Sequence, residues 1–356
     1  MADFEGLYLD LERYRPQLER FYESRTTWRP HLRALLDSLL GGKLPDYPVS
    51  YPSDWGIPVP LPGYEGQVIN VWVEMYPGFI RLIRTLDAVE RASLEKRLRE
   101  GKATLVQFLG YDNSFCNALL HVCMSLAMGP MWPIPEHVIT NEFYLLDGKK
   151  FSTSQDHAIW AEEMIHDVGS DRLRYFVGRT NPEHWQTNFT LAEFAEADRR
   201  ELNEIWRPAI DALFTLSSGS HPCGAGEIDL LAQGLIGWAR TGLEKFYSLE
   251  EFSLRHASRV LLDFVEAAGK YAQGHREKAP LSEDAPTDSS GTASALLHAL
   301  SLFSAPLMPN FAERVWGGLG LKGNLWRRGW SDLDEHRQVE ILDKPVDWFL
   351  PPSVRA

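Results

Sequence analysis

The stretch Leu145-Leu146-Asp147-Gly148-Lys149-Lys150-Phe151-Ser152-Thr153-Ser154 decides how this chain is interpreted. The residues before it, 139–146, are rich in β-branched and aromatic side chains, which favour a strand, and Asp147-Gly148 is typical of a two-residue hairpin turn. Apolar residues at helical spacing follow from Ala158 to Val177. A loop with lysine and hydroxyls beside a helix suits a polyphosphate, because lysine offers a point charge and hydroxyls offer donors. The alternative interpretation is a polar hairpin tip.

Further segments on both sides of this loop resemble one enzyme family, in the family's own order. Lys150-Phe151-Ser152-Thr153-Ser154 resembles the KMSKS loop of class I aminoacyl-tRNA synthetases. The other runs resemble segments of methionyl-tRNA synthetases: Asp54-Trp55-Gly56-Ile57-Pro58-Val59-Pro60, Val71-Trp72-Val73-Glu74, Phe108-Leu109-Gly110-Tyr111-Asp112 and Gly169-Ser170-Asp171-Arg172-Leu173-Arg174-Tyr175-Phe176. A weaker likeness extends from roughly Ala2 to Gly320, so the resemblance is specific.

The composition is that of a globular protein of about two domains, with 356 residues, 44% of them hydrophobic and 24% charged. No apolar run approaches the length of a membrane span, and the N-terminus lacks the basic and apolar regions of a signal peptide. Three scattered cysteines predict neither a disulfide framework nor a metal site, which fits the cytoplasm. The net charge of −13 is unfavourable for nucleic-acid binding.

Pattern and resemblance together predict an α/β fold followed by helices. The expected strands are 67–73, 104–109 and 139–146. Helices are expected over 5–40 and 78–100, and another is expected after the turn 110–113, to about Met128; such alternation implies parallel βαβ crossovers. The resemblance implies a helical connecting segment (1–50), the C-terminal half of a Rossmann-like class I synthetase catalytic domain (51–190) and an α-helical bundle like the anticodon-binding domain (191–356). Residues 274–291 are expected to form an exposed loop.

The expected nucleotide site has two parts. In the resembling family, the residues that match Gly110 and Asp112 approach the adenosine ribose, and a carboxylate can accept hydrogen bonds from ribose hydroxyls; the alternative for Asp112 is a cap of the next helix. Lys150, Ser152 and Ser154 match the catalytic loop. Thr153 stands where the family has a second lysine that helps to neutralise the pyrophosphate, which weakens the inference of activity without cancelling it.

The resemblance also implies an amino-acid pocket. Its residues here are Trp72, Tyr76, Phe79, Asn113, Cys116 and Asn117. Trp72 matches the family's tryptophan, with a core aromatic on a strand as the alternative, whereas the other positions differ from those of a methionine pocket. Asn113 replaces an isoleucine and Cys116 a phenylalanine, so a small or polar amino acid other than methionine is expected; the alternative for Asn113 is a helix cap.

Positions that contact the anticodon in the resembling family have lost their polar groups. They fall near Pro208 and Ala212, and the stacking tryptophan expected after Gly269-Lys270-Tyr271 has no counterpart in Arg276-Glu277-Lys278-Ala279-Pro280. Binding of tRNA is therefore not expected. No segment resembles the HIGH motif, since residues 2–45 already resemble the segment that follows the family's insertion.

These features predict a methionyl-tRNA synthetase-like protein that lacks the HIGH half. The expected activity is ATP-dependent activation of an amino acid, with Mg²⁺ accompanying ATP, and transfer to an acceptor other than tRNA in natural-product biosynthesis. Too few strands are expected for a complete sheet, so a homo- or hetero-oligomer is predicted, with no membrane partner. Two alternatives stay open: a non-catalytic binding subunit of a synthetase-like complex, and a fragment of a methionine-tRNA ligase.

Overall fold

The structure, a computed structural model, describes residues 5–129, 132–217, 220–223, 228–278, 289–330, 333, 337–340 and 348–349. It contains two compact units, Met1–Phe143 and Tyr144–Ala356. This division into compact units does not test the three segments expected from the sequence, 1–50, 51–190 and 191–356, which stay a prediction. Within the described part of the chain, every helix is too short or too polar to span a membrane.

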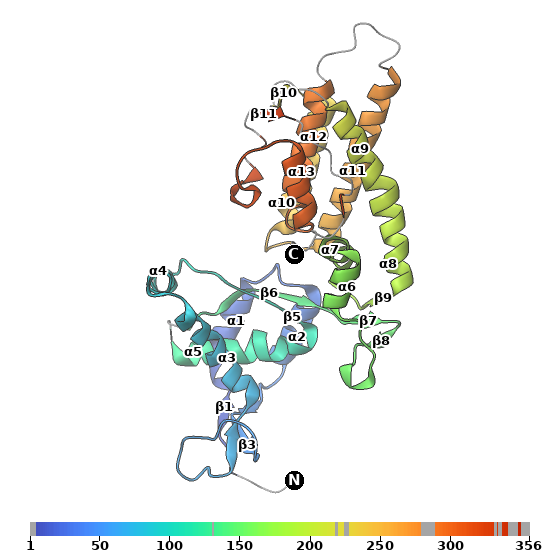
Figure 1. The fold of residues 1–356 in the computed structure, drawn as a ribbon. Helices are drawn as coiled ribbons and strands as arrows, with labels where there is room; N and C mark the ends of the chain where they lie inside the picture. Colours follow the sequence, from blue (N-terminus) through green and yellow to red (C-terminus); the bar gives the residue numbers. More distant parts are fainter. Residues whose placement is uncertain are drawn as a thin grey trace. The chain divides into compact units, whose positions relative to one another are not determined.

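The first unit combines five helices with three strand pairs (Figure 1). The helices are α1 (Arg15–Glu23), α2 (Pro30–Gly41), α3 (Val71–Leu82), α4 (Ala88–Arg99) and α5 (His121–Met128). The strands are β1 (Tyr8–Asp10), β2 (Asp46–Pro48), β3 (Ser50–Pro52), β4 (Gln67–Ile69), β5 (Leu105–Gly110) and β6 (Pro135–Asn141). Strands β1 and β2 pair antiparallel, as do β3 and β4, whereas β5 and β6 pair parallel.

The crossover between β5 and β6 confirms one expected βαβ unit. The 3₁₀ turn η3 (Tyr111–Asn113), the π-helix η4 (Phe115–Leu120) and α5 link the two strands. Leu119, Leu120 and Val122 are fully buried there and form a core with α1 and α2. Figure 1 shows α3 and α5 on the same side of the β5–β6 pair, and residues of α1, α2, α3 and α5 share one core. The apolar face of this crossover therefore supports the strand β5 and the turn that follows it.

Two other expectations for this unit are wrong. The predicted strand 67–73 ends at Ile69, because Asn70 Oδ1 accepts a hydrogen bond from Trp72 N at 3.0 Å and starts α3. Strand β4 pairs with β3, so it forms no parallel crossover with β5. The predicted helix 78–100 is also divided, because the Asp87 carboxylate accepts from the first free N–H groups of α4.

The second unit joins a three-stranded sheet to a helical bundle. The sheet has the order β8 (Lys149–Lys150), β7 (Tyr144–Leu146), β9 (Thr187–Phe189), with β7–β9 parallel. The first helices are α6 (Ala161–Val168), α7 (Ser170–Arg179), α8 (Leu191–Ala197), the π-helix η6 (Asp198–Trp206) and α9 (Arg207–Leu216). Then come α10 (Leu230–Tyr247), α11 (Leu254–Lys278), α12 (Ser289–Ser304) and α13 (Pro309–Gly318), with the strand pair β10 (Ser220–Cys223) and β11 (Arg337–Glu340).

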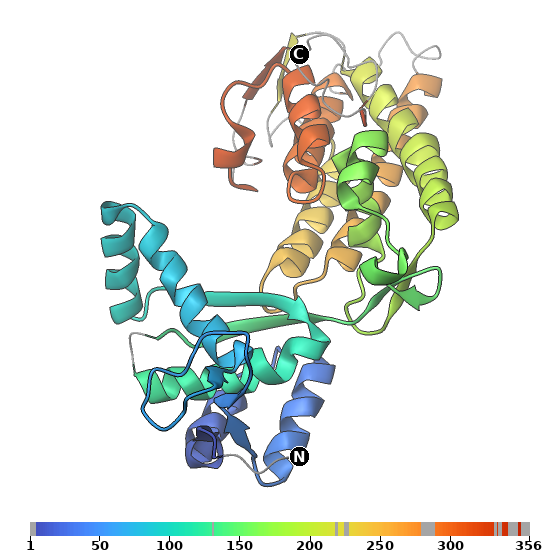
Figure 2. The ribbon, with the colours of Figure 1, turned by 60° about the horizontal axis from the view of Figure 1, so that its bottom comes forward.

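Helices α9 to α13 lie side by side as a bundle in Figures 1 and 2. Its core contains Trp206, Phe264, Phe303 and Phe311, all fully buried. The helices expected after Leu191 are thus present. The expected loop 274–291 begins later than predicted, since α11 continues to Lys278; residues 279–288 lie outside the described part.

The run Gly169 to Phe176 connects the small sheet to the bundle. Gly169, at φ 85°, separates α6 from α7, which the sequence suggested as one helix. The Asp171 carboxylate accepts a hydrogen bond from Phe311 N at 2.5 Å, at the start of α13. Arg174 donates to the carbonyl oxygen of Leu307 at 2.9 Å. Polar side chains of α7 therefore satisfy backbone groups at the start of α13.

Candidate functional site

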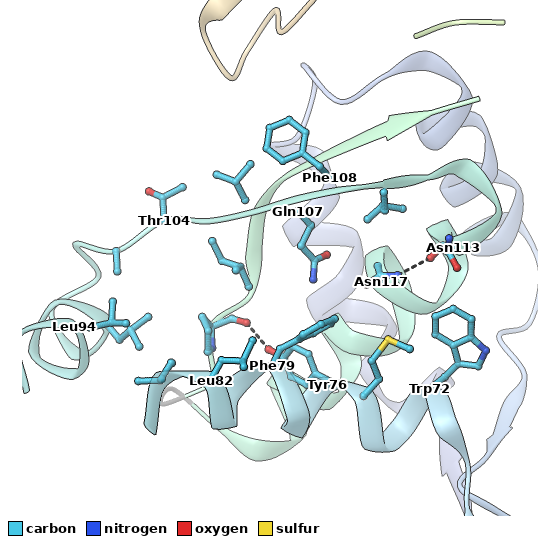
Figure 3. Close-up of a pocket in the computed structure, with 18 residues that line it drawn as sticks. Trp72, Tyr76, Phe79, Leu82, Leu94, Thr104, Gln107, Phe108, Asn113 and Asn117 are labelled. Carbon is cyan, nitrogen blue, oxygen red and sulfur yellow. Dashed lines mark hydrogen bonds between the residues drawn. The ribbon is translucent and has the colours of Figure 1, made fainter. Parts of the chain in front are cut away.

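A cavity of about 690 Å³ opens in the first unit between α3, α4 and β5 (Figure 3). Most of its lining is apolar, and Leu82, Leu94, Leu98 and Val106 contribute to it. It also contains five of the six side chains expected to form an amino-acid pocket, namely Trp72, Tyr76, Phe79, Asn113 and Asn117. A cavity of this size and polarity is typical of a small-molecule site.

Helix α3 supplies the aromatic wall. Trp72, Tyr76 and Phe79 lie four and three residues apart and therefore share one face of the helix. The Tyr76 hydroxyl donates to the carbonyl oxygen of Pro133 at 2.5 Å and also contacts Ser125 Oγ. Burial raises the pKa of Tyr76, so this phenol stays protonated and keeps its donor. The wall is thus held from behind by hydrogen bonds.

His121 supports this wall and was not expected as a site residue. Its ring stacks on Tyr76, with 4.8 Å between centroids, and its Nε2 lies 3.0 Å from the carbonyl oxygen of Trp72. The residue is 0% exposed, and burial lowers the pKa of the imidazole, which is therefore neutral near pH 7. Its spacing of four residues from Asn117 was the signal in the sequence that both lie on one helical face.

The two asparagines lie at the end of the cavity nearest the carboxyl end of β5. Asn117 Nδ2 donates to the carbonyl oxygen of Asn113 at 3.0 Å, and Asn113 Nδ2 donates to Asp112 Oδ1 at 3.2 Å. Both Nδ2 groups thus serve local contacts, and Figure 3 shows the one between Asn117 and Asn113. The residue before the π-helix, its N-cap, is Ser114 rather than Asn113.

Cys116 lies outside the cavity, contrary to expectation. Its thiol is buried next to the Tyr47 hydroxyl, and burial raises its pKa. The physical reason is helical rotation. Asn113 and Asn117 are four residues apart and share one face of the helical turn, whereas Cys116, the residue before Asn117, projects from another face. The expectation of a small or polar ligand depended in part on the volume opened by Cys116, and the large apolar lining removes that argument.

Gly110 and Asp112 lie where β5 ends. A Cβ at Gly110 would come within 2.6 Å of Asp112 Oδ1, so a glycine permits the carboxylate to fold back over the strand end. The Asp112 side chain is exposed. Sheets with parallel strands bind ligands at this carboxyl edge, where an exposed carboxylate can accept hydrogen bonds from hydroxyl groups.

The lysine–serine loop follows a hairpin of the expected kind. Asp147 and Gly148 have φ of 48° and 78°, as a two-residue turn of this type requires, and β7 and β8 pair antiparallel. Lys150 is exposed at the end of β8. Beyond it, Ser152 and His157 exchange two backbone hydrogen bonds of 2.9 Å.

This closed loop presents the expected hydroxyl groups together. Ser152 Oγ and Ser154 Oγ lie 3.3 Å apart, and a 3₁₀ turn, η5, spans Thr153–Gln155. His157, which the sequence did not single out, ties the loop to the sheet, because its Nε2 lies 2.8 Å from the carbonyl oxygen of Leu146. The loop therefore has a defined shape, and its interpretation as a phosphate site, with a polar hairpin tip as the alternative, stays a prediction.

The remaining expectations concern metal, cysteines and tRNA. Among the described residues no three His, Cys, Asp or Glu side chains gather as metal ligands. Cys116 and Cys123 are both buried free thiols. Pro208 is exposed on α9, and Ala212 is buried in the bundle core. Neither position offers a side-chain group that could hydrogen-bond a base.

A second cavity, of about 660 Å³, lies in the second unit beside α7, β9 and α8. The Arg255 guanidinium lies over the Trp185 ring there, 5.0 Å from its centroid. Arg179 forms an ion pair of 2.8 Å with Glu201. Charges of both signs line this cavity, so it shows no preference for an anion or a cation.

Comparisons with known proteins agree with these features. A model of the family tRNA synthetases class I (M) matches residues 1–210. The methionine–tRNA ligase of Korarchaeum cryptofilum is 28% identical over 343 residues, which are 94% of this chain and 61% of that protein. The methionine–tRNA ligase of Thermomicrobium roseum is 28% identical over 348 residues, 90% of this chain and 56% of that protein. The chain thus spans somewhat over half the length of these relatives.

Among solved structures, methionyl-tRNA synthetase of Mycobacterium tuberculosis in complex with methionyl-adenylate superposes with a TM-score of 0.78 at 19% identity, over 98% of this chain and 69% of that chain. This likeness confirms the expected class I synthetase fold. The residues that match the family model include those of the cavity, the end of β5, the lysine–serine loop and α7. Since that model covers more than half of the 356 residues, the chain belongs to the class I tRNA synthetase (M) family.

Proposed function

We propose that the protein takes part in ATP-dependent activation of an amino acid as its acyl adenylate. The observation that carries the proposal is the cavity of the first unit. It brings Trp72, Tyr76, Phe79, Asn113 and Asn117 together beside the carboxyl end of a parallel strand. An apolar cavity with a few polar groups next to such a strand end suits an amino acid beside a nucleotide.

In this reaction the amino-acid carboxylate attacks the α-phosphorus of ATP. A carboxylate–phosphorus bond forms, the bond between the α- and β-phosphates breaks, and pyrophosphate leaves. We assign Asp112 to the ribose hydroxyls, from which its exposed carboxylate can accept. We assign Lys150 to the phosphates, because a positive charge stabilises the charge that develops on pyrophosphate. The hydroxyls of Ser152, Thr153 and Ser154 supply further donors; Mg²⁺ enters with ATP as part of the substrate.

The proposal extends to an amino acid other than methionine and to an acceptor other than tRNA, as in natural-product biosynthesis. Asn113 lines the cavity and supports the first part, since its amide oxygen can accept a hydrogen bond that a thioether cannot donate. Pro208 and the buried Ala212 support the second part, since base recognition needs polar or stacking groups.

We also propose that the protein works as an oligomer. Within the described residues β5 and β6 pair only with each other, so each has an edge with unpaired backbone groups. A second copy or another polypeptide can pair there. Light scattering that shows only a monomer, together with full activity of that monomer, would contradict this part.

The experiment is ATP–pyrophosphate exchange by the full chain with each common amino acid, compared between Lys150→Ala and Lys149→Ala. Both lysines are exposed and adjacent, so the second variant is a matched control. We expect Lys150→Ala to lower the exchange rate by roughly 10²-fold, because the contact acts in the transition state, and Lys149→Ala to lower it little. Equal effects of the two variants, or no exchange with any amino acid in any oligomeric form, would refute the proposal.

A further inference from the structure

Gln107 is a polar residue on an otherwise apolar face of the cavity. Side chains on a strand alternate, so Leu105, Gln107 and Leu109 share one face of β5. Figure 3 shows the Gln107 side chain pointing from β5 toward Phe79 and Asn117 across the cavity. An amide has thus replaced the apolar side chain that the alternation predicts at the middle of this wall.

The Gln107 amide lacks a hydrogen-bond partner for its oxygen. Its Oε1 is buried, and among the described residues nothing donates to it. Among the described residues, neither asparagine oxygen of the cavity is a buried atom without a partner, and the Nδ2 groups of Asn117 and Asn113 donate to Asn113 O and Asp112 Oδ1. Burying an acceptor without a donor is unfavourable, so in native proteins such a group calls for a partner, which a bound ligand can supply. Gln107 is therefore the polar group in this cavity that is left for a ligand.

We propose that the cavity takes an amino acid with an aromatic side chain that ends in a hydroxyl group, and that Gln107 hydrogen-bonds this hydroxyl. That the ligand is an amino acid rests on the proposed function; that it carries a hydroxyl rests on Gln107. The atom of this amide that lacks a partner is its oxygen, which can only accept, so the ligand must supply a hydrogen-bond donor. A hydroxyl group at the end of the ligand side chain supplies this donor.

The size and lining of the cavity favour an aromatic body for this ligand. Its volume of about 690 Å³ is large for an amino acid, so a bulky side chain fits it. Trp72, Tyr76 and Phe79 offer ring edges and faces, against which an aromatic ring packs better than an aliphatic chain. Strand geometry places Gln107 about 10 Å before the end of β5 at Gly110, since each residue advances the strand by about 3.3 Å. Gln107 therefore lies well back from the end of the strand, so a ligand that extends from the strand end to Gln107 needs a long side chain.

The test measures binding of free amino acids to the full chain by titration calorimetry, without ATP. We expect tyrosine to bind roughly 10- to 100-fold more tightly than phenylalanine, because phenylalanine leaves the buried amide unpaired. O-methyltyrosine, which has the same ring and an oxygen but no donor, should bind as weakly as phenylalanine. Methionine should bind more weakly than tyrosine.

The matched variants are Gln107→Leu and Gln186→Leu. Gln186 is exposed in the second unit, so its replacement makes the same chemical change outside this cavity. Gln107→Leu should bring the affinities for tyrosine and phenylalanine to within about threefold of each other, and Gln186→Leu should preserve the difference. If Gln107→Leu fails to fold, the three ligands on the unaltered chain still decide the matter.

Several outcomes overturn the inference: equal affinities for tyrosine and phenylalanine, tight binding of O-methyltyrosine, methionine as the tightest ligand, or no binding of any aromatic amino acid. Failure of the proposed function is seen separately, as absence of ATP–pyrophosphate exchange. Selective binding of tyrosine without exchange would retain the role of Gln107 and refute amino-acid activation.

Discussion

Asp171 should contribute more to the stability of the second unit than any exposed carboxylate of the same helices. Helix α13 begins at Pro309, and its N-cap, Met308, provides no side-chain acceptor. The carboxylate of Asp171, a residue of α7, provides this acceptor instead: Phe311 N donates to it at 2.5 Å and Asn310 N at 3.4 Å. Asp171→Ala therefore removes the acceptor and leaves a buried N–H group at Phe311 without a partner.

The magnitude follows from these contacts. A hydrogen bond to a charged group contributes about 1.5–3 kcal/mol, and an unpaired buried donor costs about 1–3 kcal/mol. Burial raises the pKa of Asp171, so the carboxylate itself carries a desolvation penalty that alanine relieves. We expect Asp171→Ala to lower the free energy of unfolding by about 3 kcal/mol. For a unit of roughly 200 residues this lowers the melting temperature by about 6–12 °C. Asp171→Asn keeps a neutral acceptor and should lose about half as much.

Thermal and guanidinium denaturation followed by circular dichroism measure this effect. Asp167→Ala is the matched control, since Asp167 is exposed on the neighbouring helix α6 and should lose less than about 0.5 kcal/mol. A loss below 1 kcal/mol for Asp171→Ala, or equal losses for the two variants, would refute the role of Asp171 as the cap of α13.

Three further predictions concern the loop, the cavity and the bundle. His157→Ala removes the contact with Leu146 O, so the Michaelis constant for ATP in pyrophosphate exchange should rise roughly 2- to 10-fold; an unchanged constant would contradict an ordering role. Burial lowers the pKa of His121 below 6.5, so from about pH 6.5 downward the unfolded chain binds a proton that the folded chain does not. The melting temperature should therefore fall as the pH is lowered through this range. It should fall less steeply for His121→Phe than for the control His166→Phe, at an exposed histidine; the same pH dependence in both variants would contradict this. With Pro208 and Ala212 on α9, gel shifts at physiological salt should not distinguish a methionine anticodon from a scrambled one, and clear discrimination would restore the tRNA ligase alternative.

Features with strong local signals were predictable from the sequence. The Asp147-Gly148 turn was correct because both positions need positive φ, which few residue pairs tolerate. The order strand–helix–strand of the β5–α5–β6 crossover was correct, but the expected strand 139–146 is divided into β6, which ends at Asn141, and β7, which begins at Tyr144 in another sheet. The end of the expected strand at residue 73 was wrong, because Asn70 caps a helix whose β-branched first residues had suggested a strand. Local propensity is weaker than a cap combined with a buried helical face.

The amino-acid sequence by itself thus determined the family, the order of the motifs and the chemical types of the site residues. Only the tertiary structure decided which side chains meet. It directed Cys116 toward Tyr47, placed His121 behind Tyr76, tied His157 to the sheet and left the Gln107 amide unpaired on the cavity wall. The physical reason is that the direction of a side chain depends on the rotation of its helix or strand and on contacts with segments far away in the chain. Residue type and spacing do not specify those contacts.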